Sequence, residues 1–376
     1  MKISAIGILT YFSCQFVIGQ PGYGQNIKET AHILIADLSY APGDSVKADI
    51  YLPVNYKTQV SPILIFFGEG DTRKFSHYTN WAKLAASKGF AGIVYSSTEN
   101  KGKEHFTALL NFLVANRNSF QIDPQQLAIY AGSGNATEGL ALANNNIRIK
   151  AAMIFYGSSP IDHFRIDLPV LLIRSGLDNT GLNRKLDSLA LRALQANAPY
   201  TIVNINYAEH AFEDIQDPQI LSIMTRSLDF LQLSLQPASQ KNYAEMKSEI
   251  EAMRELYNGN LDSALNSFKQ ALKNHPGNNE TERQIGNIYI EMKNWSLAIE
   301  AYNAAIEHGN WRKGEIAKKK CLAFAATNQF DSAISEMRVL KSIGFGWFNQ
   351  DDYTNNSLFQ ALTESASYKK FLKEIN

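Results

Sequence analysis

The stretch Leu127-Ala-Ile-Tyr-Ala-Gly-Ser133-Gly-Asn-Ala-Thr-Glu-Gly-Leu140 predicts the fold of the first half of this chain. Apolar residues lead into a turn of small residues with one serine at its apex, and a helix-compatible stretch follows. Gly132 and Gly134 flank the serine, as a sharp strand–turn–helix connection requires. The usual pattern around such a serine is Gly-x-Ser-x-Gly, but Ala131 and Asn135 occupy the outer positions here. Asn135 is the best substitute for glycine in a left-handed conformation. Clusters of serine, glycine and asparagine also form ordinary turns. This motif alone therefore leaves open whether Ser133 is a catalytic nucleophile or a residue of a simple turn.

Two further signals follow in the order that a catalytic serine demands. The strand-like run 169–174 is followed by Asp178, and the run 200–206 is followed by His210. The carboxyl ends of parallel strands lie at one edge of a sheet, so we expect Ser133, Asp178 and His210 to converge there. Ser133 would attack, His210 would take its proton, and Asp178 would hold the imidazole.

Simpler interpretations exist for each of these residues taken alone. Asp178 could cap the following helix, and His210 could be a half-buried or helix-capping histidine. The next candidates for the acid are Asp162 and Asp187, and helix capping is the favoured interpretation of Asp187. The joint order and placement of serine, acid and histidine favours the catalytic interpretation.

The composition bounds the class of protein. The chain has 376 residues, 45% of them hydrophobic and 11% aromatic, which is enough for two domains with their own cores. Lys and Arg together number 36, and so do Asp and Glu, which gives a formal net charge of zero. This balance does not favour a nucleic acid partner, which would need a basic face. Cys14 and Cys321 are the only cysteines, which excludes a disulfide framework and a cysteine-based metal site in the mature chain.

The amino-terminal residues have the pattern of a targeting segment. One lysine precedes a short apolar run and then small residues, which predicts a signal peptide over residues 1–24, cleaved after Gly19 or Gly24. Cys14 is an alternative site of lipid attachment, although the residues before it match that pattern poorly. We expect an exported protein, periplasmic or secreted, with or without a lipid anchor. No later stretch is long enough to cross a membrane.

Residues 25–236 alternate strand-like and helix-like segments. This alternation predicts an α/β domain with a doubly wound, mostly parallel sheet and helices on both faces. Only a short linker separates the strand ending at Tyr156 from the next one at Pro169, so we expect a shallow, open pocket. Residues 236–241 are typical of a linker between domains.

Residues 237–376 follow a different period, of about 34 residues. Small and aromatic positions recur together at that spacing, which is typical of paired helices that cross closely. They are Ala252, Ala264, Phe268 and Ala271; Gly286, Tyr289, Ala298, Tyr302 and Ala305; and Cys321, Phe324, Ala333, Met337 and Leu340. This region resembles three tetratricopeptide repeats with a capping helix near the carboxyl terminus. An ordinary helical bundle is the alternative.

The first domain resembles the α/β-hydrolase superfamily, most closely its dienelactone-hydrolase-like branch. The resemblance rests on the serine turn, on the segment ending at Asp178 and on the sequence His210-Ala-Phe212. It implies the triad Ser133, Asp178 and His210, and an oxyanion hole made from the Gly134 amide and an amide in the Gly68–Glu69 loop. It implies no metal and no organic cofactor.

The leading hypothesis is therefore an exported serine hydrolase. It would cleave an ester or related acyl bond of a small molecule or carbohydrate, and its repeats would dock a protein partner. A peptidase of the same fold is less favoured, because no gating domain precedes the core. The alternative from a different class is a binding or scaffold protein, in which the hydrolase domain is degenerate and the repeats hold a partner. Asn135 in place of the usual glycine is the feature that keeps this alternative open.

Overall fold

The computed structural model describes residues 31–41, 43, 45–98, 101–214, 217–344 and 357–375. The predicted signal peptide and Cys14 lie outside these residues. The chain divides into two compact units, Met1–Ala244 and Glu245–Asn376. Most of the stretch predicted to be a linker forms the start of helix α7 (Pro237–Glu245). The boundary between the two units therefore lies at the end of this helix, later in the chain than predicted.

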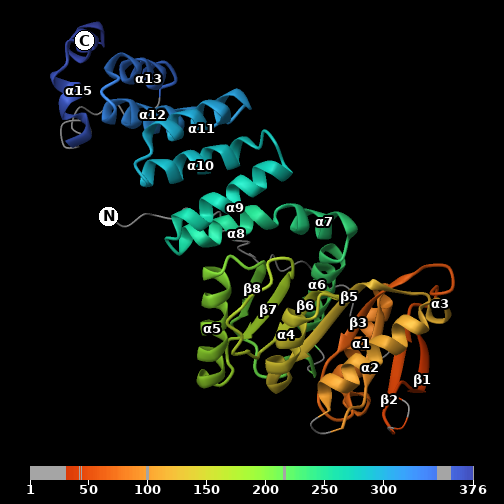
Figure 1. Ribbon diagram of the computed structural model, residues 1–376. Helices are drawn as coiled ribbons and strands as arrows, with labels where there is room; N and C mark the ends of the chain where they lie inside the picture. Colours follow the sequence, from red (N-terminus) through yellow and green to blue (C-terminus); the bar gives the residue numbers. More distant parts are fainter. Residues whose placement is uncertain are drawn as a thin grey trace. The chain divides into compact units, whose positions relative to one another are not determined.

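An eight-stranded sheet forms the centre of the first unit within the described residues, in the order β1-β2-β4-β3-β5-β6-β7-β8 (Figure 1). The strands are β1 (Ile33–Ser39), β2 (Lys47–Leu52), β3 (Ser61–Phe66), β4 (Ala91–Tyr95), β5 (Ile122–Gly132), β6 (Ile149–Phe155), β7 (Val170–Ser175) and β8 (Tyr200–Ile205). β2 pairs antiparallel with β1 and β4, and every pairing from β4 to β8 is parallel. The prediction of a mostly parallel sheet with an opening pair of strands is confirmed.

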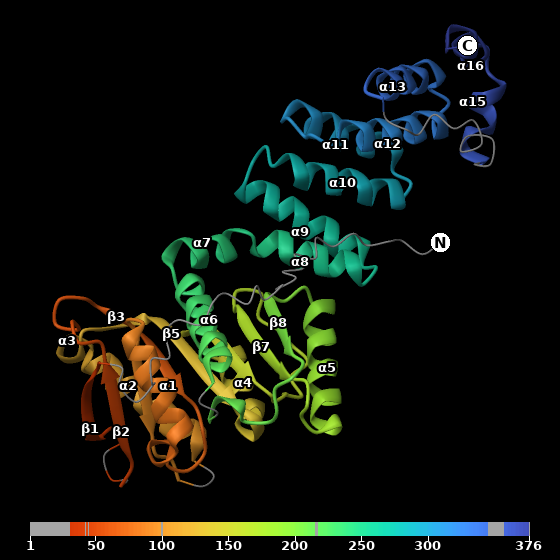
Figure 2. The same ribbon diagram turned by 180° about the vertical axis from the view of Figure 1, so that it is seen from behind.

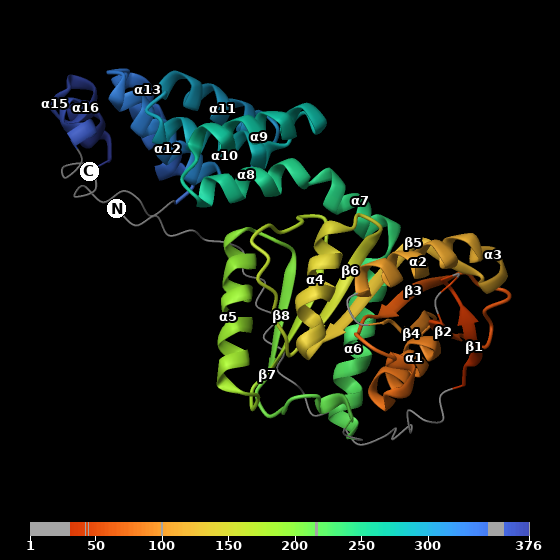
Figure 3. The same ribbon diagram turned by 60° about the horizontal axis from the view of Figure 1, so that its bottom comes forward.

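Helices cover both faces of this sheet (Figures 1 and 2). One face carries α1 (Ser76–Ser87) and α6 (Pro218–Ser234), whose apolar side chains share a core with Phe66 and Phe155. The other face carries α2 (Gly102–Ala115), α4 (Ala136–Asn145) and α5 (Thr180–Gln195), which pack with Ile65 and Ile129. A short helix, α3 (Arg117–Phe120), precedes β5. Figure 3 shows the helices packed around this sheet. The residues of the central strands are buried and mostly apolar, as a parallel sheet covered on both faces requires.

The parallel strands place the predicted site residues at one edge of the sheet. Ser133 follows β5 directly, Asp178 follows β7, and His210 follows β8. β5, β6, β7 and β8 are parallel and lie in that order in the sheet, so the loops after β5, β7 and β8 leave it at the same edge.

Helices that pack in successive pairs form the second unit. The pairs are α8 (Lys247–Tyr257) with α9 (Leu261–Asn274), α10 (Asn279–Glu291) with α11 (Trp295–Glu307), and α12 (Lys313–Ala326) with α13 (Phe330–Ser342); the end of the described chain adds η5 (Ser357–Phe359), α15 (Gln360–Glu364) and α16 (Ala366–Ile375). The second helices of the pairs begin 34 and then 35 residues apart.

The recurring small positions lie where these helices touch. A Cβ atom on Gly286 would come within 2.6 Å of the Tyr302 ring, and Ala252, Ala264, Ala298 and Ala333 are all fully buried. The predicted helical region is therefore confirmed, and its assignment to tetratricopeptide repeats stays a prediction. Among the described residues, no helix combines the length and the apolar character that crossing a bilayer would require.

Candidate active site

Ser133 occupies a strained turn between β5 and α4. Its backbone φ is 54°, a left-handed conformation that is uncommon for residues other than glycine, and a one-turn 3-10 helix, η3 (Ser133–Asn135), leads into α4. Asn135 has φ −70° and ψ −16°, so it is right-handed helical. Asn135 therefore does not use the left-handed conformation that asparagine tolerates, because Ser133 itself adopts it.

His210 reaches the serine from the loop after β8. Its Nε2 atom lies 2.8 Å from Ser133 Oγ. Its ring lies against the ring of Tyr156, with 4.7 Å between the ring centroids. Tyr156 (φ 35°) and Ala211 (φ 55°), which follows the histidine, are also left-handed. Strained backbone therefore gathers around this contact, as it does at many functional sites.

Asp178 lies on the far side of the imidazole. Its Oδ2 atom is 2.7 Å from His210 Nδ1, and its Oδ1 atom accepts a 2.6 Å hydrogen bond from the Asn179 amide. The Asp178 side chain is 4% exposed and that of His210 is 37% exposed, so the acid is enclosed while the base faces solvent. The amino-terminal cap of α5 is Asn179, which accepts from the Gly181 and Leu182 amides. The helix-capping alternative for Asp178 is therefore wrong.

The two other candidates for the acid lie elsewhere. Asp187 is inside α5 and accepts hydrogen bonds from Arg174, one of them 2.8 Å long. Its expected role as a helix cap is wrong, since Asn179 is the cap. Asp162 is exposed, in the segment between β6 and β7. The structure brings Ser133, His210 and Asp178 together and brings neither alternative acid to the histidine.

The loop predicted to contribute to the oxyanion hole contacts the serine turn through Asn135. The Glu69 amide donates a 3.2 Å hydrogen bond to Asn135 Oδ1, and Asn135 Nδ2 donates a 2.9 Å bond to the Tyr78 hydroxyl. Gly68 has little room for a side chain, because a Cβ atom there would lie 2.7 Å from Thr72 Cγ2 and 2.9 Å from the Tyr78 hydroxyl. A Cβ atom on Gly134 would meet open space. The Asn135 carboxamide thus ties the serine turn to the loop after β3 and occupies the amide expected to bind an oxyanion.

A buried polar cluster next to the triad was not predicted from the sequence. Glu213, in η4 (Phe212–Asp214), is 3% exposed and accepts hydrogen bonds from Tyr130 and Tyr156. Burial raises the pKa of Glu213 above its ordinary value, and the hydrogen bonds oppose that shift. The one signal available in the sequence is the position of this acid, three residues after the histidine.

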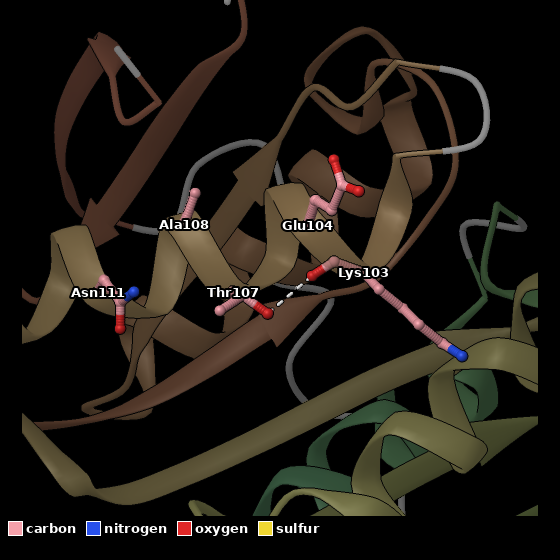
Figure 4. A pocket seen from close by; sticks show the side chains of 5 residues that line it. All are labelled: Lys103, Glu104, Thr107, Ala108 and Asn111. Carbon is pink, nitrogen blue, oxygen red and sulfur yellow. Dashed lines mark hydrogen bonds between the residues drawn. The ribbon is translucent and has the colours of Figure 1, made fainter.

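One hollow in the described chain is lined by none of these residues. A hollow of about 460 Å³ lies along α2 and is lined by Lys103, Glu104, Thr107, Ala108 and Asn111 (Figure 4). The hydrogen bond drawn there joins the Thr107 hydroxyl to the Lys103 carbonyl within the helix. In the part of the chain that the structure describes, no three His, Cys, Asp or Glu side chains are grouped to hold a metal ion.

No protein-family model and no curated protein matches this sequence. Solved structures do resemble it. An esterase structure from Rhizomucor miehei has a TM-score of 0.46 and 15% identity, and covers 57% of this chain and 93% of its own. An α/β hydrolase from a Medee basin deep-sea metagenome library has a TM-score of 0.45 and 14% identity, and the match covers 55% of this chain and 99% of the hydrolase. A dienelactone hydrolase from Anabaena variabilis has a TM-score of 0.43 and 15% identity, and the match again covers 55% of this chain and 99% of the other protein. At this level of similarity, such likenesses carry no argument about function.

Proposed function

We propose that this protein is a serine hydrolase that cleaves an ester or related acyl bond through an acyl-enzyme. The observation that carries the proposal is the continuous chain of hydrogen bonds from Ser133 Oγ through the imidazole of His210 to Asp178, with lengths of 2.8 and 2.7 Å. A nucleophile within hydrogen-bond reach of a base, itself oriented by a third group, is the arrangement that activates a hydroxyl. The left-handed backbone of Ser133 supports the same conclusion.

In the proposed acylation step, Ser133 Oγ attacks the acyl carbon while its proton passes to His210 Nε2. Asp178 accepts the Nδ1–H bond, which holds the imidazole in the tautomer with a free Nε2 lone pair and stabilises the imidazolium that forms. The leaving alcohol then takes the proton from Nε2. Water, activated by the same nitrogen, attacks the acyl-enzyme, releases the acid and restores the serine.

The negative oxygen of each tetrahedral intermediate needs donors that are already in place. We propose the amides of Gly134 and Glu69 for this role. The 3.2 Å bond from the Glu69 amide to Asn135 Oδ1 must then yield to the oxyanion. A net hydrogen bond contributes on the order of 1 kcal/mol, whereas losing one oxyanion donor costs about 10²–10³ in rate, so the exchange favours the intermediate.

The substrate class and the surroundings belong to the same proposal. The exposed base is compatible with a medium or bulky ester, such as an acylated carbohydrate. We further propose export directed by residues 1–24, and docking of a protein partner by the helical repeats. The mass of the mature amino terminus distinguishes cleavage after Gly19 or Gly24 from lipid attachment at Cys14.

A non-catalytic binding protein is the second candidate. The observation that favours it is the Asn135 carboxamide, whose oxygen already occupies the amide of Glu69. A degenerate hydrolase could keep such a contact permanently, while the repeats bound a partner. This candidate predicts a folded chain that neither reacts with a serine probe nor turns over an ester.

Labelling and turnover separate the two candidates. The purified mature chain is treated with a fluorophosphonate, and p-nitrophenyl acetate hydrolysis is measured in parallel. We expect labelling at Ser133, located by peptide mass spectrometry, and the loss of both signals in Ser133→Ala. Ser342→Ala is the matched control, a change in the helical unit at a side chain that donates to the Val339 carbonyl and makes no other hydrogen bond seen among the described residues. A folded wild-type chain with no labelling and no turnover would overturn the hydrolase proposal and favour the binding candidate.

A further inference from the structure

A carboxyl group that the proposed chemistry does not use lies three residues beyond the histidine. Glu213 Oε1 accepts hydrogen bonds from the Tyr130 hydroxyl at 2.7 Å and the Tyr156 hydroxyl at 3.1 Å, with Trp81 Nε1 at 3.5 Å. The two hydroxyls are themselves 3.3 Å apart. Glu213 Oε2 is buried and has no hydrogen-bond partner among the described residues.

The donors come from segments that carry or touch the triad. Tyr130 lies in β5, three residues before Ser133, and Tyr156 packs its ring against His210. A Cβ atom on Gly132, next to the nucleophile, would lie 2.9 Å from the Tyr130 hydroxyl and 3.2 Å from the Tyr156 hydroxyl. One carboxyl oxygen therefore joins the strand that leads into the serine, the residue against the imidazole and the loop that bears the imidazole.

The electrostatics of this cluster favour a neutral acid. Among the described residues, the polar groups seen to interact with Glu213 are Trp81 and Tyr78 from α1, Tyr130 from β5 and Tyr156 after β6, and none of these four carries a positive charge. Burial holds the pKa values of Tyr130 and Tyr156 well above the ordinary value, so both hydroxyls stay protonated and can donate. Burial likewise raises the pKa of Glu213, which favours its uncharged form.

Fold stability alone gives a weak reason for an acid at this position. An apolar side chain of similar volume would avoid the cost of removing a carboxyl from water. What an apolar residue lacks is direction, because hydrogen bonds from two hydroxyls fix both the distance and the orientation between the segments that they join.

We propose that Glu213 is a positioning residue, which sets the position of His210 relative to Ser133 through Tyr130 and Tyr156. This inference rests on the proposed hydrolase activity, because positioning matters for turnover only if the triad is catalytic. A misplacement of about 1 Å can cost on the order of 100-fold in rate, so a tie of this kind is large enough to matter.

The test compares Glu213→Gln with Glu213→Met. The amide keeps an acceptor oxygen and resembles the neutral acid, whereas methionine keeps the volume and removes the acceptor. We expect Glu213→Met to lower kcat about 10- to 100-fold with KM little changed, and Glu213→Gln to restore most of that loss. Glu282→Met, at another buried glutamate in the helical unit, is the matched control and should leave kcat unchanged.

A second readout does not depend on turnover. The His210 Nδ1 proton, shared with Asp178, should give a low-field NMR signal that His210→Asn removes. We expect this signal to broaden or shift in Glu213→Met and to return in Glu213→Gln. Tyr130→Phe and Tyr156→Phe each remove one donor, and they provide the same comparison, with smaller losses, if Glu213→Met does not fold.

Each outcome decides the inference. A folded Glu213→Met chain with wild-type kcat and an unchanged low-field signal would overturn it. So would a loss in Glu213→Gln as large as in Glu213→Met, because that would show a need for charge instead of position. If the wild type shows no Ser133-dependent turnover, the proposed function fails, and the NMR comparison alone decides whether Glu213 positions the imidazole.

Discussion

Two buried carboxyl groups, those of Asp178 and Glu213, lie near His210 and have different partners. Asp178 contacts the imidazole directly at 2.7 Å and accepts a further hydrogen bond from the Asn179 amide. Glu213 makes no such contact with the histidine and instead accepts from two tyrosines in the core. Desolvation and neutral donors favour an uncharged Glu213, whereas Asp178 faces a base that becomes positive in the proposed reaction.

This difference shows how one short loop can serve both chemistry and architecture. A carboxylate beside the base can stabilise charge that develops during the reaction. A neutral carboxyl beneath it can only fix positions, which matters equally in every protonation state of the histidine. Changes at the two carboxyl groups should therefore have different effects. A change at Asp178 alters the chemistry and leaves the fold intact, whereas a change at Glu213 alters the geometry of the site and the stability together.

The largest expected effect comes from a change on the Asp178 side of His210. Asp178→Asn keeps the shape of the side chain but stabilises the wrong imidazole tautomer, so we expect kcat for p-nitrophenyl acetate to fall by roughly 10⁴-fold. Circular dichroism and thermal unfolding should stay close to wild type. Asp187→Asn, which disturbs an exposed pair with Arg174, is the control and should change kcat by less than about 3-fold. Full activity of Asp178→Asn would reassign the acid.

An effect of intermediate size is expected for Glu213→Gln on the pH dependence of the free energy of unfolding. Because the folded pKa of Glu213 is raised, the folded chain binds this proton more tightly than the unfolded chain does. The resulting stability is fully present below the unfolded pKa and is lost as pH rises through the folded pKa. Glu213→Gln cannot ionise, so its free energy of unfolding should improve relative to wild type as the pH rises from about 4 to 8.

Urea unfolding at a series of pH values measures this difference. Parallel curves for wild type and Glu213→Gln over the whole range would show that Glu213 does not titrate differently in the folded chain. Asp178→Asn, measured in the same way, separates the two carboxyl groups, since any pH dependence that belongs to Glu213 persists in that variant.

The smallest expected effect concerns the serine turn, which is tied to the loop after β3. Asn135→Ala releases the Glu69 amide from the Asn135 oxygen. We expect kcat/KM to rise by up to about 5-fold, because an exposed hydrogen bond of about 1 kcal/mol no longer has to be exchanged for the oxyanion. Tyr78→Phe removes the partner of Asn135 Nδ2 and leaves the bond to the Glu69 amide in place, so it serves as the control. A large fall in kcat/KM for Asn135→Ala would instead make this side chain a support of the oxyanion loop.

Much of the site was predictable because its signals are local. A serine between glycines after an apolar strand, and an acid and a histidine each just after a later strand, predict which strand ends carry them. The structure brings Ser133, Asp178 and His210 within hydrogen-bonding distance. The role of Asn135 was not predictable, since its contacts reach Glu69 and Tyr78, 66 and 57 residues away.

Local chemistry in the chain was enough to determine the alternation of strands and helices, the residue at each strand end and the repeated small positions of the helical region. Those features depend on periodicity, on glycine and on short-range turn geometry. Only the tertiary structure decided that Glu213 meets Tyr130 and Tyr156, that Asn179 instead of Asp178 caps α5, and that Ser133 itself takes the left-handed backbone. The reason is that the strand order of the sheet determines which loops become neighbours, and hydrogen bonds between distant loops leave no regular spacing in a sequence.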